Sequence, residues 1–328
     1  MKDPRGTRRA VLAAVLAASM APLAAAQDWT PAGPVRLVVP FAAGGPTDAL
    51  ARQLAEELRP RLRQTVIVEN RAGAGGNLGA TEVARAQPDG LTLLFATTGQ
   101  LAINVSLYRS LAYDPVRSFE PVISIGNLPN VLAVHPQVPA RNLPEFVAHA
   151  KTRPGQLLFA SSGNGATSHL AGVLFNRMAG TELRHVPYRG TGPALNDLIA
   201  GHVQMTFTDV LTAQPQIQAG NIVPIGVTTV ERSAAMPDVP TLSEQGLNGF
   251  DVSVFFAIVA PKGTPPGTVR TLNRAFVDVL SDEKVKGVLA RQGIRADPDT
   301  SAEHLGRMIA REIPKWREIV AASGAQLD

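Results

Sequence analysis

The side chains that most often carry catalysis are sparse and poorly spaced in this chain. It has no cysteine, which excludes thiolate nucleophiles, disulfides and cysteine–zinc sites. A nucleophile elbow needs glycine two residues before and two residues after its serine, but Phe159 stands two residues before Ser161. The six histidines form neither an H-x-x-x-H pair nor an H-E-x-x-H motif. We therefore expect no enzyme, no metal site and no cofactor.

Glycine-rich turns at the ends of apolar strands are the recurring feature instead. In the first, the run Val35–Val39 reads as a buried parallel strand, and an amphipathic helix follows the turn. The free N–H groups at the start of such a helix form an anion-binding site that needs no charged side chain. Ligands of open α/β sheets bind outside the carboxyl ends of strands. We expect these turns to face a common cleft: Phe41–Thr47, Thr97–Gly99 and Ser161–Thr167.

Two nucleotide-binding patterns fail on spacing. In the segment Gly73–Gly79, Leu78 stands where a dinucleotide fingerprint that begins at Gly73 and Gly75 requires its last glycine. No glycine turn is followed by the G-K-S/T of a P-loop. We therefore interpret Gly73–Gly79 as a structural loop that opens a helix.

Asp209 follows the alternating strand residues Val203, Met205 and Phe207. Its carboxylate could cap the next helix. It could also accept a hydrogen bond from a ligand ammonium or hydroxyl, or hold the loop Ser161–Thr167. A carboxylate beside an anion is unfavourable unless it meets a donor. Both interpretations stay open on the sequence.

The first 26 residues have the pattern of a signal peptide. A basic stretch, residues 2–9, precedes the apolar run Ala10–Ala18, and Ala24–Ala26 offers a cleavage site before Gln27. An uncleaved membrane anchor is the alternative, but the apolar run is short for a transmembrane span. We expect export to the periplasm with cleavage near Ala26.

Charge and hydropathy limit the partners of the remaining chain. Residues 1–26 hold four of the 31 basic and one of the 27 acidic residues, so the rest is close to neutral. It lacks the basic stripe with interleaved aromatics of a nucleic-acid binder, and it has no apolar run of membrane-spanning length. A small-molecule partner and no nucleic acid are expected.

Strand and helix patterns alternate along the chain, which predicts an α/β fold of two lobes. The pattern begins afresh near Asn127–Asn130, between two predicted strands, Val122–Ile125 and Val131–Val134. A strand at Val252–Val259 returns the chain to its first half. We therefore expect residues 27–128 and 251–328 to form lobe 1, and residues 129–250 to form lobe 2.

At these turns the chain resembles the Bug family of periplasmic solute-binding proteins, the receptors of tripartite tricarboxylate transporters. The resemblance covers the chain after residue 26, and it departs from the family at Phe255-Phe256, where tryptophan is frequent. The matching segments are Val39–Asp48, Val68–Gly76, Pro88–Gly90, Ser161–Gly165, Val186–Gly190, Pro237–Thr241 and Ala260–Pro265.

The resemblance implies a type II periplasmic-binding fold, with two lobes that close on a small carboxylate held by backbone amides and waters. It also implies delivery to transporter membrane subunits, and we expect the receptor to be a monomer. Carried over by motif or position, the ligand contacts are Phe41, Ala42, Ala43, Gly44, Gly45, Thr47, Thr97, Thr98, Gly99, Ser161, Ser162, Gly163, Asn164, Gly165, Ala166, Thr167 and Asp209.

Two other functions remain as alternatives. One is a periplasmic α/β hydrolase that would use Ser162 or Ser168 with His169. The other is a sensory receptor whose partner is a signalling membrane protein, which needs the same recognition between closed lobes as transport does.

Overall fold

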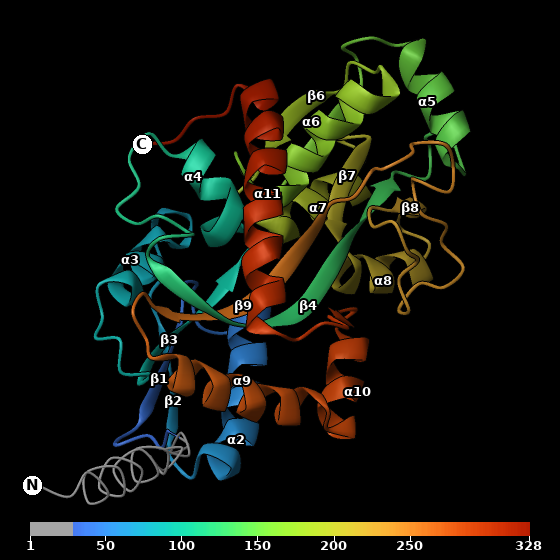
Figure 1. Ribbon diagram of the computed structural model, residues 1–328. Helices are drawn as coiled ribbons and strands as arrows, with labels where there is room; N and C mark the ends of the chain where they lie inside the picture. The colour runs from blue at the N-terminus through green and yellow to red at the C-terminus, as the bar shows by residue number, and fades with distance from the viewer. Residues whose placement is uncertain (1–28) are drawn as a thin grey trace, which may run out of the picture.

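The computed structural model describes residues 29–328 (Figure 1). The predicted signal peptide and its cleavage near Ala26 lie outside these residues. Within 29–328, strands and helices alternate, which is the α/β class expected from the sequence. No helix of this part of the chain combines the length and the apolar character needed to cross a bilayer.

In the first half of the sheet, the central strand is β1 (Val35–Val39), and it pairs in parallel with a strand on each side. This strand lies between β2 (Val66–Asn70) and β3 (Thr92–Thr97). Its valine and leucine side chains are fully buried, because helices cover both faces of the sheet. On one face lie α2 (Pro46–Leu62), α9 (Pro266–Leu280) and α10 (Glu283–Arg291), and on the other lies α3 (Asn77–Ala84).

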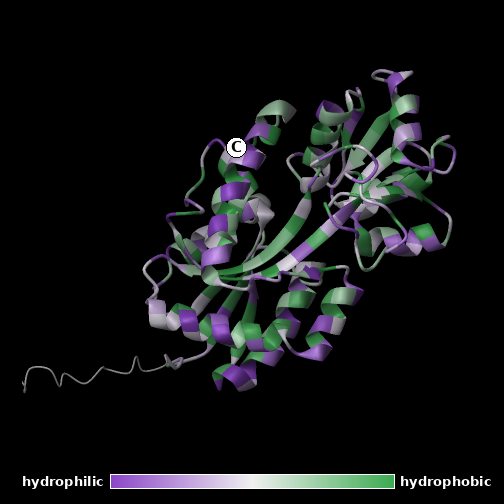
Figure 2. Cartoon of the chain, turned by 45° about the vertical axis from the view of Figure 1, so that its right-hand side comes forward, coloured by the Kyte–Doolittle hydropathy of each residue, from purple (hydrophilic) through white to green (hydrophobic). Residues whose placement is uncertain are grey.

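The second half repeats this arrangement: β5 (Leu158–Ser161) lies between β6 (Arg184–Pro187) and β7 (Met205–Asp209), and all three strands are parallel. The strand β8 (Val223–Val227) follows them in the chain. The helices are α5 (Leu143–Lys151), α6 (Thr167–Ala179), α7 (Thr191–Ile199) and α8 (Val210–Gln218). Figure 2 shows largely hydrophobic strands inside helices of mixed colour.

Two long strands join the halves, and one of them corrects the prediction of two separate strands. The strand β4 runs without a break from Phe119 to Val134. Its first part pairs with β9 (Ser253–Pro261), and from Asn130 onward it pairs with β7 and β8. Polar residues and Pro129 interrupt its apolar pattern, so the sequence resembles a loop there. Pairing with β9 keeps that stretch extended. The division into two lobes itself stays a prediction.

The helix α11 (Ala302–Ser323) contacts elements of both halves. It packs on β4, on α6 and on α4 (Asn104–Leu107), which follows a short π-helix, Gly99–Ile103. Beyond α11, the backbones of Leu107 and Leu327 are hydrogen-bonded. The short strand β10 (Arg295–Ala296) pairs with β4 on the way to α11. In Figure 1, α11 runs alongside both halves.

Candidate functional site

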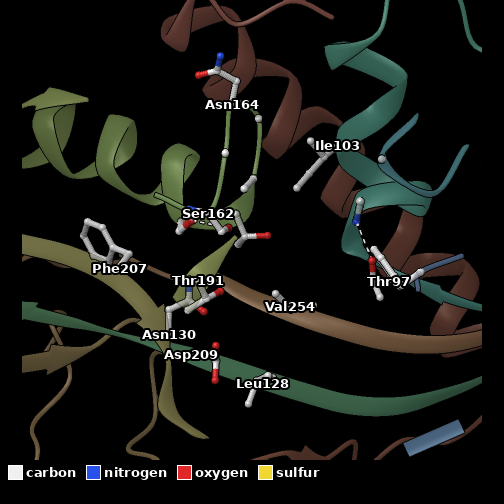
Figure 3. Close-up of a pocket in the computed structure, with 18 of the residues that line it drawn as sticks. Thr97, Ile103, Leu128, Asn130, Ser162, Asn164, Thr191, Phe207, Asp209 and Val254 are labelled. Carbon is white, nitrogen blue, oxygen red and sulfur yellow. Dashed lines mark hydrogen bonds between the residues drawn. The ribbon is translucent and has the colours of Figure 1, made fainter. Parts of the chain in front are cut away.

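A cleft of about 500 Å³ lies where β1, β3, β5 and β7 end, between the two halves (Figure 3). This volume is in the range of small-molecule sites. The first half contributes Phe41, Thr47, Gly75, Thr97, Gly99, Gln100, Ile103, Asn104, Leu107 and Tyr108, and the C-terminal tail adds Leu327. The second half contributes residues 162–168, Thr191, Ala194, residues 206–209 and Leu211. The joining strands add Leu128, Asn130, Val254 and Phe256.

The structure brings many of the predicted contacts together at this cleft and leaves others outside it. Those that line it are Phe41, Thr47, Thr97, Gly99, Ser162, Gly163, Asn164, Gly165, Ala166, Thr167 and Asp209. Those that do not are Ala42, Ala43, Gly44, Gly45, Thr98 and Ser161. That the first group binds ligand stays a prediction.

The turn after β1 places only its two ends on the cleft. Residues 42–44 are exposed. Gly44 has φ +85°, a backbone conformation that favours glycine, so a glycine is needed here to form the turn. The Gly44 amide donates to Asp48 Oδ2 at 2.9 Å, so it is not free for a ligand. By contrast, the structure records no partner within residues 29–328 for the amides of Thr47 and Asp48, in the first turn of α2.

Asp48 holds this turn in place. It is buried, and besides Gly44 it accepts hydrogen bonds from Arg52 and from Asn70 Nδ2. The hydrogen bond from the Arg52 guanidinium, more than any other contact, lowers the pKa of Asp48 to about 2. Asn70 Nδ2 also donates to the Phe41 carbonyl at 3.1 Å. The position of Phe41 at the cleft therefore depends on Asp48 and Asn70.

The turn after β5 is held by its own hydrogen bonds. The amides of Ser162, Gly163 and Gly165 donate to Ser168 Oγ, Ser161 Oγ and His169 Nδ1, respectively. Ser161 is fully buried, and its hydroxyl lies 2.6 Å from His185 Nε2, which explains why it does not reach the cleft.

The first turn of α6 supplies unpaired backbone N–H donors on the side of the cleft that the turn after β5 forms. No bond in the described chain uses the amides of Thr167, Ser168 or His169. The N-terminus of α6 therefore keeps unpaired N–H groups beside the cleft.

Two stacked histidines lie behind this turn. The ring centroids of His169 and His185 are 3.8 Å apart. Burial lowers the pKa of His169, and burial together with the neighbouring His169 lowers the pKa of His185 to about 4. Both rings are therefore neutral at pH 7.

The serine–histidine pairing of the hydrolase alternative does not form. Ser162 and Ser168 hydrogen-bond to each other at 3.0 Å, while His169 Nδ1 accepts from the Gly165 amide. The serine that does contact a histidine, Ser161, is buried away from the cleft. The geometry thus gives no support to that alternative.

The segment after β3 contributes more than the sequence indicated, but not Thr98. The Thr98 hydroxyl accepts from the Phe255 amide of β9 at 2.8 Å, so it points away from the cleft. Gln100 Oε1 accepts from both the amide and the hydroxyl of Thr97 at 2.9 Å and fixes that side chain at the cleft. Asn104 and Tyr108 also line the cleft. No sequence pattern singled them out: Asn104 begins α4 and Tyr108 follows its last residue, both beyond the glycine turn that marked this segment.

Asp209 both caps a helix and lines the cleft. Its Oδ1 accepts from the Thr212 amide at 2.8 Å, and its Oδ2 accepts from the Thr212 hydroxyl at 2.9 Å. Asn130, which sequence reasoning missed, is its pairing partner across β4 and β7. Among the lining residues that the structure describes, Asp209 carries the only charged side chain. Within residues 29–328, no lysine, arginine or histidine lines the cleft.

The two aromatic residues that depart from the family pattern lie on opposite sides of β9. Phe256 lines the cleft, whereas Phe255 lines a second cavity behind it. Of these two residues, only Phe256 adds an apolar surface to the cleft, together with Val254.

Comparison with known proteins finds a matching family and similar relatives. Residues 50–325 match the tripartite tricarboxylate transporter family receptor. The chain is 37% identical to protein BugT of Bordetella pertussis over 304 residues, or 92% of each chain.

Solved structures agree with this match. R. palustris Rpa4515 with adipate has a TM-score of 0.79 and 36% identity, over 92% of this chain and 100% of that one. The periplasmic binding protein BugD has a TM-score of 0.75 and 37% identity, over 90% and 99%. MatC from Rhodopseudomonas palustris with bound malate has a TM-score of 0.75 and 36% identity, over 88% and 99%.

Proposed function

The chain belongs to the tripartite tricarboxylate transporter receptor family, and on this premise we propose that it captures a small carboxylate in the cleft between its two halves. The observation that carries the proposal is the pair of helix starts at the cleft. The first turns of α2 and α6 both keep amides without a partner in the described chain, and both helices begin beside residues that line it. Relatives of known structure were solved with adipate and with malate.

The energetics favour several weak contacts over one strong contact. A helix N-terminus contributes about 0.3–1 kcal/mol to an anion, and up to about 2 kcal/mol when partly buried. A micromolar ligand needs about 8 kcal/mol. Two helix starts are insufficient alone, so direct and water-bridged hydrogen bonds from lining groups that still have a free donor, such as the Asn130 carboxamide, must add to them.

The remaining parts of the proposal concern the cell. The receptor is exported with its signal peptide removed near Ala26, acts in the periplasm as a monomer without enzymatic activity, and delivers its ligand to transporter membrane subunits. Capture of those membrane subunits by the ligand-loaded protein, and not by the empty protein, tests delivery. Capture of a signalling membrane protein in their place would favour the sensory alternative.

Thermal-shift screening tests ligand capture. The panel contains mono-, di- and tricarboxylates, amino acids and nicotinate. At least one carboxylate is expected to raise the melting temperature, since a ligand at 100 times its Kd adds about 2.7 kcal/mol of stability. A panel in which no carboxylate shifts the melting temperature would contradict the proposal.

A further inference from the structure

The wall of the cleft contains an asparagine and an aspartate that face each other from neighbouring strands. Asn130 of β4 and Asp209 of β7 are partners in the antiparallel register. Residues directly opposite in such a pair project from the same face, with β-carbons about 4.5–5.5 Å apart. Both line the cleft, and Figure 3 shows them on one side of it, with Thr191 beside them and Thr97 on the other side.

The Asn130 carboxamide has no hydrogen-bond partner in the described chain. The residue is 4% exposed. Its backbone N–H and C=O both bond to the Thr228 hydroxyl, but no hydrogen bond within residues 29–328 involves its side chain. The carboxamide is therefore unpaired and open to the cleft, where its Nδ2 can donate and its Oδ1 can accept. Its position on the cleft means that a ligand can supply the missing partner.

Asp209 has acceptor capacity left over. A carboxylate has about four lone-pair sites, and Thr212 occupies two of them. No lysine, arginine or histidine lines the cleft in the described chain, so no cationic side chain of the cleft can occupy the remaining lone-pair sites of Asp209. A second ligand carboxylate at this point would meet a like charge, whereas a donor group would be favoured.

We propose that Asn130 and Asp209 form the specificity determinant of this cleft and select a carboxylate that also carries a hydrogen-bond donor, a protonated amine or a hydroxyl. The inference rests on the proposed function. The ligand carboxylate lies toward the starts of α2 and α6. Its donor group binds Asp209, and Asn130 completes the contact through Oδ1 or Nδ2.

Calorimetry with matched ligands tests this selectivity. The acids differ only in one group: 4-aminobutyrate and 4-hydroxybutyrate against butyrate, and aspartate and malate against succinate. In at least one set, the donor-bearing acid is expected to bind about tenfold or more tightly than its unsubstituted partner, as for a hydrogen bond to a charged group.

Three variants locate the effect. Asp209→Asn keeps an oxygen that can cap α8, and Asn130→Ala removes only the carboxamide. Each is expected to bring the affinity ratio close to one. Asp282→Asn is the matched control, because Asp282 also caps a helix, α10, but lies outside the cleft. It is expected to leave the ratio unchanged. Melting curves check that all three variants fold.

The outcomes separate this inference from the proposed function. If carboxylates bind but the affinity ratio is near one in the unaltered protein, or persists in both cleft variants, the selectivity is overturned and the proposed function stands. If no carboxylate binds at all, the proposed function fails and the selectivity fails with it.

Discussion

Gly165, in the turn after β5, lies directly against Leu107 of α4. A β-carbon built on Gly165 would come within 2.3 Å of Leu107 Cδ2, and the glycine has φ +73°. The two residues belong to the two different predicted lobes, and both line the cleft. The absence of a side chain at residue 165 therefore allows the two halves to touch at the cleft.

Gly165→Ala is expected to lower stability and weaken ligand binding. The left-handed backbone costs a non-glycine residue roughly 1–2 kcal/mol, and the clash with Leu107 adds to it. The matched control is Gly220→Ala, because Gly220 also has φ +73° but has no atom within 4 Å of the added β-carbon. Urea unfolding and calorimetry of both variants separate backbone strain from the contact. Equal losses in both would show that the contact is unimportant.

A second substitution tests the same contact from its other side. Leu107→Ala in the Gly165→Ala background removes the methyl groups that the new β-carbon meets. Part of the lost ligand affinity is expected to return, as a non-additive double-mutant cycle. Strictly additive effects would mean that the two residues do not interact.

Thr167→Pro is expected to weaken carboxylate binding roughly tenfold, since a hydrogen bond to a charged group is lost. Proline is tolerated at the first position of a helix, where it removes only the free amide. Ala166 has ψ 154°, which suits the residue before a proline. Thr167→Ala loses the same hydroxyl but keeps the amide. If the affinity fell equally in both variants, loss of the hydroxyl would explain the effect. That result would contradict binding of the carboxylate by the Thr167 amide.

The stability of the protein is expected to fall between pH 6.5 and pH 4 because of His185. Its pKa is lowered in the folded state from 6.5 to about 4, so the unfolded chain binds more protons in this window. The stabilising contribution is complete above pH 6.5 and is lost as the pH falls. For a half-buried group, the loss at pH 5 amounts to roughly 1–2 kcal/mol.

Unfolding curves at pH 7 and pH 5 measure this loss. His185→Gln is expected to reduce the difference between the two values. His202→Gln serves as the control, because the His202 side chain is 70% exposed. The same pH dependence in His185→Gln and in the unaltered protein would remove His185 from the explanation.

Asp48→Ala is expected to destabilise the protein by about 1–3 kcal/mol, because Asp48 is a buried acceptor for Gly44, Arg52 and Asn70. It should also weaken ligand binding, since Phe41 is positioned through the same network. Arg52→Ala should cost less, because the Arg52 side chain is 52% exposed. Chemical denaturation ranks the two variants, and a larger loss in Arg52→Ala would contradict the assigned roles.

The local parts of the cleft were predictable from the sequence, whereas the parts made by distant pairing were not. Glycine turns after apolar strands placed Thr47 and Ser162–Thr167 correctly at the cleft edge, because strand, turn and helix start are consecutive. The same reasoning assigned Gly44 to a ligand, although its amide bonds to Asp48. A glycine signals a turn, and it does not say which way the amides point.

Asn130 shows why the rest was missed. It lies in a stretch of β4 whose polar residues and Pro129 resemble a loop, and only pairing with β7 brings it opposite Asp209. Thr98 fails for a related reason. It belongs to a plausible ligand turn, but its hydroxyl is used by β9, a strand that comes much later in the chain.

Isothermal titration calorimetry of the purified protein tests the central claim most directly. We expect at least one small carboxylate to bind with one-to-one stoichiometry and a Kd in the micromolar range or tighter, which corresponds to about 8 kcal/mol or more. The absence of measurable binding across mono-, di- and tricarboxylates, amino acids and nicotinate would contradict carboxylate capture in the cleft.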